Sequence, residues 1–212
     1  MRPDPSRPEP EVHDEKTAPV AKASGGSQTR QRILDAANEL FYNHGIRATS
    51  ADRIIEQVGL TKVTFYRHFR TKSDLVVAYL QQQSAAEQGW IRSTVHDGDP
   101  LETARAIAAG IGAASCSPGF RGCAFINAAA EYPDTQDPVR VAVDVHRAWI
   151  LEFFAEIAAQ AGASDVESVA QQLMILRDGA MVNGYLGDSA AVADSLEAGF
   201  LSILGPGDDG GR

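Results

Sequence analysis

Basic and aromatic side chains alternate in one short stretch of this chain, which reads LTKVTFYRHFRTKSDL over residues 60–75. Its cationic or potentially cationic side chains are Lys62, Arg67, His68, Arg70 and Lys72. Such side chains neutralise phosphates, and donors at helical spacing also reach base edges. A core helix would exclude these charges, and an ordinary solvent-facing helix would not carry Phe65, Tyr66 and Phe69. The stretch therefore predicts a surface that contacts a polyanion.

Helical geometry separates the two kinds of side chain. At 100° per residue, Phe65 and Phe69 fall one above the other on the side that faces a core. The residues turned away from that side are Val63, Thr64 and Arg67, with Lys62, Tyr66 and His68 on the flanks. A helix anchored by two rings in this way can place short side chains against base edges in a major groove, and donors on the neighbouring phosphates.

Turn and capping residues place this helix in a helix-turn-helix. A short apolar-periodic segment over 51–58 stops at Gly59, and only Gly59 and Leu60 separate it from Thr61, a natural N-cap. Either Thr49 or Ser50 caps the short segment, and Thr49 with Asp52 matches a capping box.

A second capping box, Thr71 with Asp74, opens a long helix that we expect from about Lys72 to His96. The N-termini of the two preceding helices direct the positive ends of their dipoles to one side. The residues at those N-termini join the candidate DNA contacts: Thr49, Ser50 and Thr61.

Formal charge is unevenly distributed along the 212 residues. The whole chain carries −9, which argues against a protein that coats nucleic acid non-specifically. Residues 29–75 hold eight Lys and Arg against five Asp and Glu, whereas residues 76–212 hold seven against eighteen. A small basic block joined to a large acidic one predicts a polyanion-binding end and a second task elsewhere.

Composition divides the chain into four parts. Residues 1–28 are rich in proline, charge and small side chains without the apolar core of a signal peptide, which predicts a disordered tail. We expect a DNA-binding domain over 29–75, a helical domain over 76–204 and a flexible tail over 205–212. No apolar run approaches the roughly 20 residues of a membrane span, so we expect a cytoplasmic protein with no membrane partner.

Beyond residues 97–100 the helical period persists, and no alternating pattern predicts a strand. The expected helices cover 100–115, 123–132, 137–162, 165–187 and 190–204. The predicted fold class is all-α, with an N-terminal three-helix helix-turn-helix domain followed by a larger helical domain.

Residues 29–75 resemble the DNA-binding domain of the TetR family of bacterial transcriptional repressors. In that family the first helix ends in Gly, and T-x-x-x-I, G-[VL]-[ST]-x-x-[ST]-[LFIV]-Y-x-[HY]-F and K-x-x-L follow. This chain reads NHGIRATSADRIIEQVGLTKVTFYRHFRTKSDL. The resemblance implies a recognition helix over 61–69, with phosphate contacts by Thr64, Tyr66, His68 and Lys72. It also implies that the exposed residues help to read bases, namely Lys62, Val63 and Arg67.

Three positions depart from the family pattern. Val63 stands where Gly or Ala is frequent, and Ile55 and Val58 stand where Ala is frequent. We expect Ile55 and Val58 to adjust the packing of the second helix. Val63 either contacts a thymine methyl group or bars some base steps.

Over residues 76–204 the resemblance is architectural and implies a small-molecule effector pocket within helices four to seven. The candidate lining residues are Trp90, Phe120, Phe125, Asn127, His146, Trp149, Phe153 and Met174. Asn127 and His146 are the most informative, because polar groups on apolar helices need partners. For each of these residues, ordinary core packing is the alternative.

The last two helices are the expected homodimer interface. Their apolar stripes consist of Val169, Leu173, Leu176 and Ala180, and of Leu196, Phe200 and Ile203. A two-fold dimer would place two recognition helices about 34–36 Å apart, at successive major grooves. Intrachain packing is the alternative for these stripes.

Two cysteines, Cys116 and Cys123, flank the stretch CSPGFRGC. A metal site would need further ligands that no CxxC or HxxxH pattern supplies, so we expect none. A redox-sensing thiol at Cys123, which precedes an expected helix, competes with two inert buried side chains.

No GxSxG, P-loop, HExxH or dinucleotide-binding motif occurs, so we expect neither an enzyme nor a cofactor. The predicted function is a homodimeric TetR-type repressor that leaves double-stranded operator DNA when a small-molecule effector binds. The alternatives are a helical ligand-binding or interaction module without DNA binding, a cysteine-based redox sensor, and an activator.

Overall fold

The computed structural model describes residues 25–205, and within that range the secondary structure is helical, without a strand. The all-α prediction is confirmed. The helices are α1 (Gly25–His44), α2 (Ala51–Val58), α3 (Lys62–His68), α4 (Lys72–Ser93), α5 (Pro100–Ser115), α6 (Ala124–Glu131), α7 (Pro138–Gln160), α8 (Val166–Leu186), the short 3₁₀ helix η1 (Ser189–Ala191) and α9 (Val192–Leu204).

Two helix ends differ from the sequence prediction by three residues or more. Helix α1 begins at Gly25 rather than near Thr29, because a glycine costs a helix only about 1 kcal/mol and nothing in this stretch stops it. Residues 25–28 therefore do not belong to a disordered tail, while residues 1–24 and 206–212 lie outside the described range. Helix α4 ends at Ser93 rather than His96, since the Thr94 hydroxyl and amide both bond to the Ile91 carbonyl and close the last turn.

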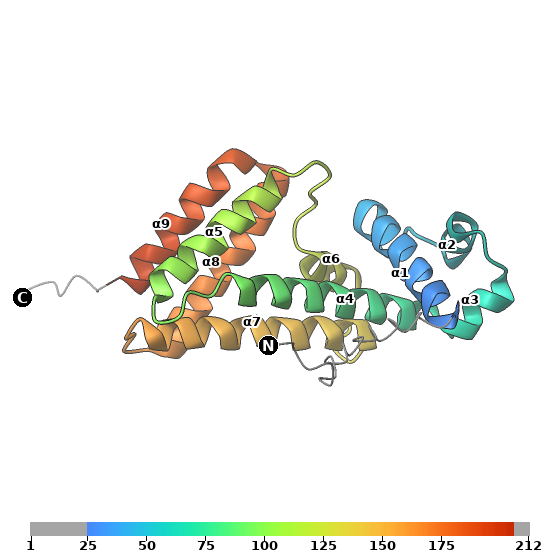
Figure 1. Ribbon diagram of the computed structural model, residues 1–212, viewed down its shortest axis with the longest axis horizontal. Helices are drawn as coiled ribbons and strands as arrows, with labels where there is room; N and C mark the ends of the chain where they lie inside the picture. Colours follow the sequence, from blue (N-terminus) through green and yellow to red (C-terminus); the bar gives the residue numbers. More distant parts are fainter. Residues whose placement is uncertain (1–24, 206–212) are drawn as a thin grey trace, which may run out of the picture.

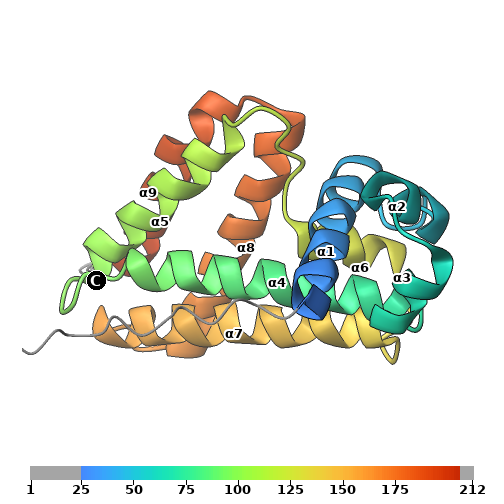
Figure 2. The same ribbon diagram turned by 45° about the vertical axis from the view of Figure 1, so that its right-hand side comes forward.

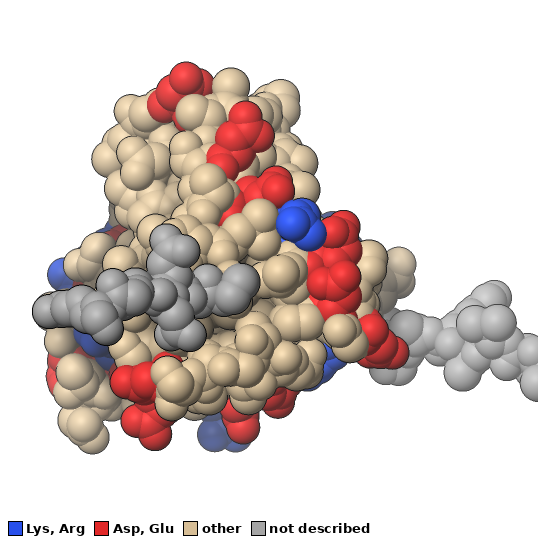
Figure 3. All heavy atoms as spheres, turned by 90° about the vertical axis from the view of Figure 1, so that its left-hand side faces the viewer, with Lys and Arg blue, Asp and Glu red and all other residues tan. Residues whose placement is uncertain are grey.

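Helices α4 and α7 run side by side along the length of the molecule (Figures 1 and 2). The head, defined as α1–α3, lies at one end of this pair. Helices α5, α8 and α9 pack together at the other end, and α6 lies against α4 and α7 close to the head. Figure 3 views the end opposite the head, where acidic side chains are prominent and basic ones are sparse, as the charge distribution predicts.

Apolar side chains form two clusters. The first cluster joins the head to the beginning of α4, to α6 and to the beginning of α7; its largest members include Ile33, Phe41, Ile54, Phe65, Leu75, Tyr79 and Phe125. The second cluster joins the end of α4 to α5, the second half of α7, α8 and α9; its members include Ile107, Ile150, Phe154, Leu173 and Phe200.

A glycine brings two helices of the second cluster into close contact. A β-carbon built on Gly112 of α5 would lie 2.4 Å from the β-carbon of Ala193 in α9. Real carbon atoms do not approach so closely, so α5 and α9 can pack at this separation only because residue 112 has no side chain.

Candidate DNA interface and regulatory core

The turn before α3 fixes the direction of that helix. Gly59 adopts φ 71°, ψ 42°, a left-handed conformation that glycine enters without strain, and its amide bonds back to the end of α2. Thr61 then caps α3 by accepting a hydrogen bond from the Thr64 amide. Both features were predicted, and together they orient α3 across the head.

Helix α3 is held by its two phenylalanines. Phe65 and Phe69 are buried in the first cluster, and the guanidinium of Arg30 in α1 lies 4.9 Å from the centre of the Phe69 ring. Ile55 and Val58 of α2 are buried in the same cluster. The face predicted to point inward does so, and it leaves the other side of α3 to solvent.

The outward side carries the residues expected to read bases. Val63 is 80% exposed and Arg67 is exposed, whereas Lys62 is held by an ion pair with Asp52 of α2, with 2.9 Å between Nζ and Oδ1. The hydrogen bond that Lys62 donates to the Asp52 carboxylate raises the pKa of Lys62. An exposed pair of this kind contributes little stability, so Lys62 can exchange Asp52 for a phosphate or a base.

The expected phosphate contacts lie along the rims of the same surface. Tyr66 is 44% exposed, and the Thr64 hydroxyl lies 3.0 Å from that of Thr61. His68 is half-buried, and its Nε2 has no hydrogen-bond partner among residues 25–205. Lys72 begins α4 and is half-buried, and burial lowers its pKa. The side chains of this surface offer mainly hydrogen-bond donors, as a phosphate requires.

Thr49 is a correction to the predicted contacts. Its side chain is 0% exposed, and its hydroxyl donates to the carbonyls of Leu40 and Gly45, so it cannot reach DNA. Ser50 is the N-cap of α2 and accepts from the Arg53 amide, so the proposed capping box of Thr49 with Asp52 is wrong as well. Two adjacent hydroxyl residues offered two cap positions, and the burial of Thr49 decides between them.

The eight predicted pocket residues do not line one cavity. Phe120 and Phe125 line a cavity of about 340 Å³, Asn127 borders one of about 220 Å³ and His146 borders one of about 370 Å³. The remaining four pack in or against the second cluster: Trp90, Trp149, Phe153 and Met174.

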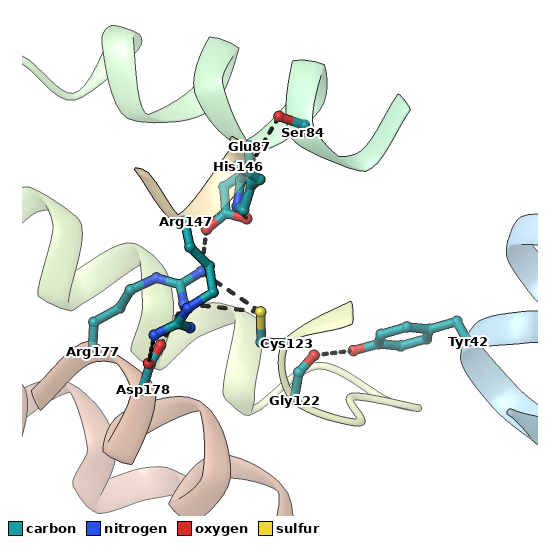
Figure 4. A network of polar contacts seen from close by, with 9 residues as sticks. All are labelled: Tyr42, Ser84, Glu87, Gly122, Cys123, His146, Arg147, Arg177 and Asp178. Carbon is teal, nitrogen blue, oxygen red and sulfur yellow. Dashed lines mark hydrogen bonds and ion pairs between the residues drawn. The ribbon is translucent and has the colours of Figure 1, made fainter. Parts of the chain in front are cut away.

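A buried ionic network joins α4, α7 and α8 (Figure 4). On α4 and α7 its members Glu87 and His146 stand between residues of the first cluster and residues of the second. The guanidinium of Arg177, 2% exposed, bonds to Glu87 of α4 and to its neighbour Asp178, which also accepts from Arg147 at 2.7 Å. His146 Nε2 lies 3.1 Å from the Glu87 carboxylate, Nδ1 lies 2.9 Å from the Ser84 hydroxyl, and the ring stacks on Phe125.

Electrostatics keep this network ionised. Burial alone would raise the pKa of Glu87, but the contact with His146 and the charge of Arg177 outweigh it and lower that pKa to about 2. Burial alone would likewise lower the pKa of Arg177, yet the anionic side chains around it raise that pKa. Of this group, only His146 was predicted as a functional residue from the sequence. Arg177 and Glu87 were missed, although each is a charged residue on a mainly apolar helix.

Helix α6 is bonded to the head at both of its ends. Before α6, the Tyr42 hydroxyl donates to the Gly122 carbonyl at 3.0 Å and accepts from the Arg121 amide at 2.9 Å (Figure 4). At its other end, the Glu131 carboxylate accepts from the amides of Ile46 and Arg47, at 2.8 and 2.6 Å. These bonds join α6 to α1 and to the turn before α2.

The predicted dimer stripes need correction. Leu173 and Phe200 are buried inside the chain and cannot meet a second copy without unpacking the second cluster. Leu196 is also buried, although it lines a groove between α8 and α9. The other four are partly buried against that cluster: Val169, Leu176, Ala180 and Ile203. Helix α8 exposes a different stripe, with Ile175 at 67%, Val182 at 44% and Leu186 at 74% exposed.

The exposed stripe of α8 continues onto a groove between α8 and α9. This groove of about 560 Å³ is lined by side chains that include Ile175, Leu176, Gly179, Ala180, Val192 and Ser195. Leu176 and Ala180, which we predicted for the dimer interface, thus line this groove while packing against the second cluster. The prediction named a single apolar stripe on α8, the inner one, and overlooked the exposed stripe, which has the same helical period.

Neither cysteine forms a disulfide: Cys116 is exposed and Cys123 is buried. Within residues 25–205, no group of three His, Cys, Asp or Glu side chains is arranged to hold a metal ion. In the same part of the chain, no helix is both long and apolar enough to cross a membrane.

Known proteins share this architecture. The crystal structure of SCO4454, a TetR-family transcriptional regulator from Streptomyces coelicolor, is similar to this chain, with a TM-score of 0.80. The two sequences are 39% identical, and the match covers 84% of this chain and 95% of the other. The chain belongs to the TetR family. The family described as "Bacterial regulatory proteins, tetR family" matches residues 33–79, which include α2, α3 and most of α1.

Other similar proteins match a shorter part of this chain or share a lower sequence identity with it. A putative TetR transcriptional regulator from Streptomyces avermitilis is 26% identical, covers 83% of this chain and 97% of its own, and gives a TM-score of 0.73. The regulator AcrR of Shigella flexneri is 37% identical over 82 residues, which are 38% of each chain, and YvkB of Bacillus subtilis is 38% identical over 69 residues, 36% of its length. The chain thus spans little more than a third of these two curated HTH-type transcriptional regulators.

Proposed function

We propose that the protein is a homodimeric transcriptional repressor that binds a roughly palindromic operator in the cytoplasm and releases it when a small molecule binds. The single observation that carries this proposal is the arrangement of α3, a helix anchored by Phe65 and Phe69 that turns Val63 and Arg67 outward. Membership of a family of transcriptional regulators supports it.

The proposal divides the work between two parts of the chain. The head, extended from the expected 29–75 to begin at residue 25, holds the DNA contacts. The helices over 76–204 hold the effector site and the dimer face. The exposed stripe of α8 supports dimerisation, because apolar side chains this exposed are stabilised by a partner surface.

Release requires the effector to bind the non-binding conformer more tightly than the DNA-binding one, because an effector with equal affinity for both shifts nothing. Helix α4 offers one route from the effector site to the head, because it begins at Lys72, an expected phosphate contact. The bonds that join α6 to Tyr42 and to the turn before α2 support a second route into the head.

The test is binding of the purified protein to its own upstream intergenic DNA, measured by fluorescence anisotropy at two salt concentrations against scrambled DNA of equal length. We expect specific binding with two subunits per site and a steep loss of affinity with salt. Equal, weak binding to both DNAs would favour the rival function, a helical module without DNA binding.

Two sets of variants test the placement of α3. Tyr66→Phe combined with Lys72→Ala should weaken binding to every sequence alike and reduce the salt dependence, because both side chains are assigned to phosphates. Val63→Ala or Arg67→Ala should change the preferred sequence instead. Unchanged binding by the double variant would show that the helix is wrongly placed.

A thiol-triggered release is the second candidate, favoured by the position of Cys123. Its Sγ lies 3.8 Å from both terminal nitrogens of the Arg177 guanidinium, which places the thiol beside the ionic network. Operator release by hydrogen peroxide should then disappear in Cys123→Ser and persist in the matched control Cys116→Ser. Release that is identical in both variants would end this candidate.

A further inference from the structure

One cavity lies where the head meets the rest of the chain. It measures about 340 Å³ and is bordered by α1, α4, the beginning of α6 and α8. Its apolar walls are Phe120, Phe125 and Met181, and α1 contributes Asn38 and Tyr42. A molecule in this junction cavity would contact the head and the larger helical part of the chain simultaneously. Its volume is at the small end of the range for ligand sites, about 300–1,000 Å³.

The charges at this cavity are all paired within the protein. Arg177 is bonded to Glu87 and Asp178, and Arg147 is bonded to Asp178 as well (Figure 4). Glu87 and Arg177, the two charged side chains that line the cavity, are of opposite sign and pair with each other. An ionic ligand would lose part of its hydration here without finding an unpaired counter-charge, which is costly. The cavity therefore favours an uncharged occupant.

One hydrogen bond crosses the cavity between α4 and α1. The Gln83 Nε2 donates to Asn38 Oδ1 at 2.9 Å. The bond occupies one polar atom of each amide and leaves the other, Gln83 Oε1 and Asn38 Nδ2, for solvent or a ligand. A ligand group that can both donate and accept, such as an amide or a hydroxyl, can insert between these two side chains and replace their mutual bond.

We infer that the junction cavity binds a small, uncharged, largely apolar ligand with one polar group, and that this ligand is the effector. The effector role of this ligand rests on the proposed function, whereas the ligand site itself does not. Insertion of the ligand between Asn38 and Gln83 separates α1 from α4. A ligand ring packed against Tyr42 also displaces that side chain, whose hydroxyl bonds to Gly122 and Arg121. Such a ligand binds better when the head has moved, which is the differential affinity that release requires.

A matched pair of fluorescent probes tests the ligand class. N-phenyl-1-naphthylamine is uncharged and carries one N–H group, and 8-anilinonaphthalene-1-sulfonate has the same rings with an added sulfonate. We expect saturable binding of the uncharged probe with one molecule per chain, and at least tenfold weaker binding of the sulfonate at this site. Absence of binding by the uncharged probe, or equal affinity of the two, would overturn the inference.

Two neighbouring alanines of α4 locate the bound probe. Ala86 lines the junction cavity, whereas Ala85 borders the separate cavity between α4 and α7. Ala86→Leu should weaken binding of the uncharged probe at least tenfold, and Ala85→Leu should leave it unchanged, with circular dichroism confirming that both variants fold. Equal effects of the two variants, or no effect of Ala86→Leu, would place the probe elsewhere and overturn the site.

Operator release is measured separately from probe binding. In the wild-type protein, saturating N-phenyl-1-naphthylamine should lower operator affinity at least fivefold, and Ala86→Leu should abolish the effect. Site-specific probe binding without a change in operator affinity would overturn the effector role. Probe binding in a protein that binds no DNA at all would instead refute the proposed function and leave the ligand site standing.

Discussion

The two apolar clusters differ in what they connect. The first cluster contains side chains from the head together with side chains from α4, α6 and α7, so the head is not closed off as an independent unit. The second cluster draws only on helices α4 to α9. A disturbance in the first cluster therefore reaches α3 directly, whereas the second cluster supports the exposed stripe of α8. Glu87 and His146, members of the ionic network, stand between residues of the two clusters on α4 and α7.

The largest expected effect comes from breaking that network. Arg177→Ala leaves Glu87 and Asp178 without their buried cation and should lower the free energy of unfolding by about 3–5 kcal/mol in urea denaturation. Arg105→Ala is the matched control, because Arg105 pairs with two carboxylates at the surface and its loss should cost about 0–1 kcal/mol. Equal losses in the two variants would show that the network does not hold the clusters together.

A pair of leucines tests the difference between the clusters. Leu75→Ala in the first cluster and Leu173→Ala in the second should each lower the free energy of unfolding by about 2–5 kcal/mol, because both side chains are buried. Measured at a temperature where both variants are folded, operator affinity should fall for Leu75→Ala alone. A similar fall for Leu173→Ala would mean that the clusters are not separate in their effect on the head.

Acid should weaken the network through Glu87. Its pKa in the folded protein, about 2, lies below the ordinary 4.5, so its contribution is complete above about pH 5 and is lost as the pH falls towards 2. About 2 kcal/mol of this contribution should disappear between pH 7 and pH 3. In urea denaturation at the two pH values, Glu87→Gln should show a correspondingly smaller difference. If Glu87→Gln lost as much free energy of unfolding between the two pH values as the wild type, Glu87 would not be the source of the acid sensitivity.

The smallest expected effect concerns the bond between α6 and the head. Glu131→Gln keeps the shape of the side chain but replaces one acceptor oxygen by a donor that opposes an amide, so the turn before α2 should loosen by about 1–2 kcal/mol. Hydrogen exchange at the amides of Ile46 and Arg47 should accelerate roughly tenfold. Exchange at the Phe65 amide in α3 serves as the internal control, and equal acceleration there would indicate general destabilisation instead.

Local signals explain why the head was predicted well from the sequence. Gly59, Thr61 and the pair of Thr71 with Asp74 act on hydrogen bonds within a few residues of themselves, so their types nearly determine the structure. Thr49 was misplaced because an adjacent serine offers the same local chemistry, and only burial distinguishes the two.

The larger helical part could not be predicted to the same depth, because its sites depend on contacts between distant residues. On α8, the stripe with Leu173 and the stripe with Ile175 have the same period, and only packing against α7, α9 and α5 decides which is buried. Arg177 was overlooked, although a charge on an apolar helix requires partners. Its partners are Glu87, 90 residues away in the sequence, and the adjacent residue Asp178.

The anchoring of α3 by its rings has an evolutionary consequence. Val63 and Arg67 are exposed and contribute nothing to the first cluster, so substitutions there should change the free energy of unfolding by no more than about 0.5 kcal/mol. Phe65 and Phe69 have no such freedom, since they hold the helix in place. A lineage that carries this head can therefore acquire new operators by mutation while its fold is inherited unchanged.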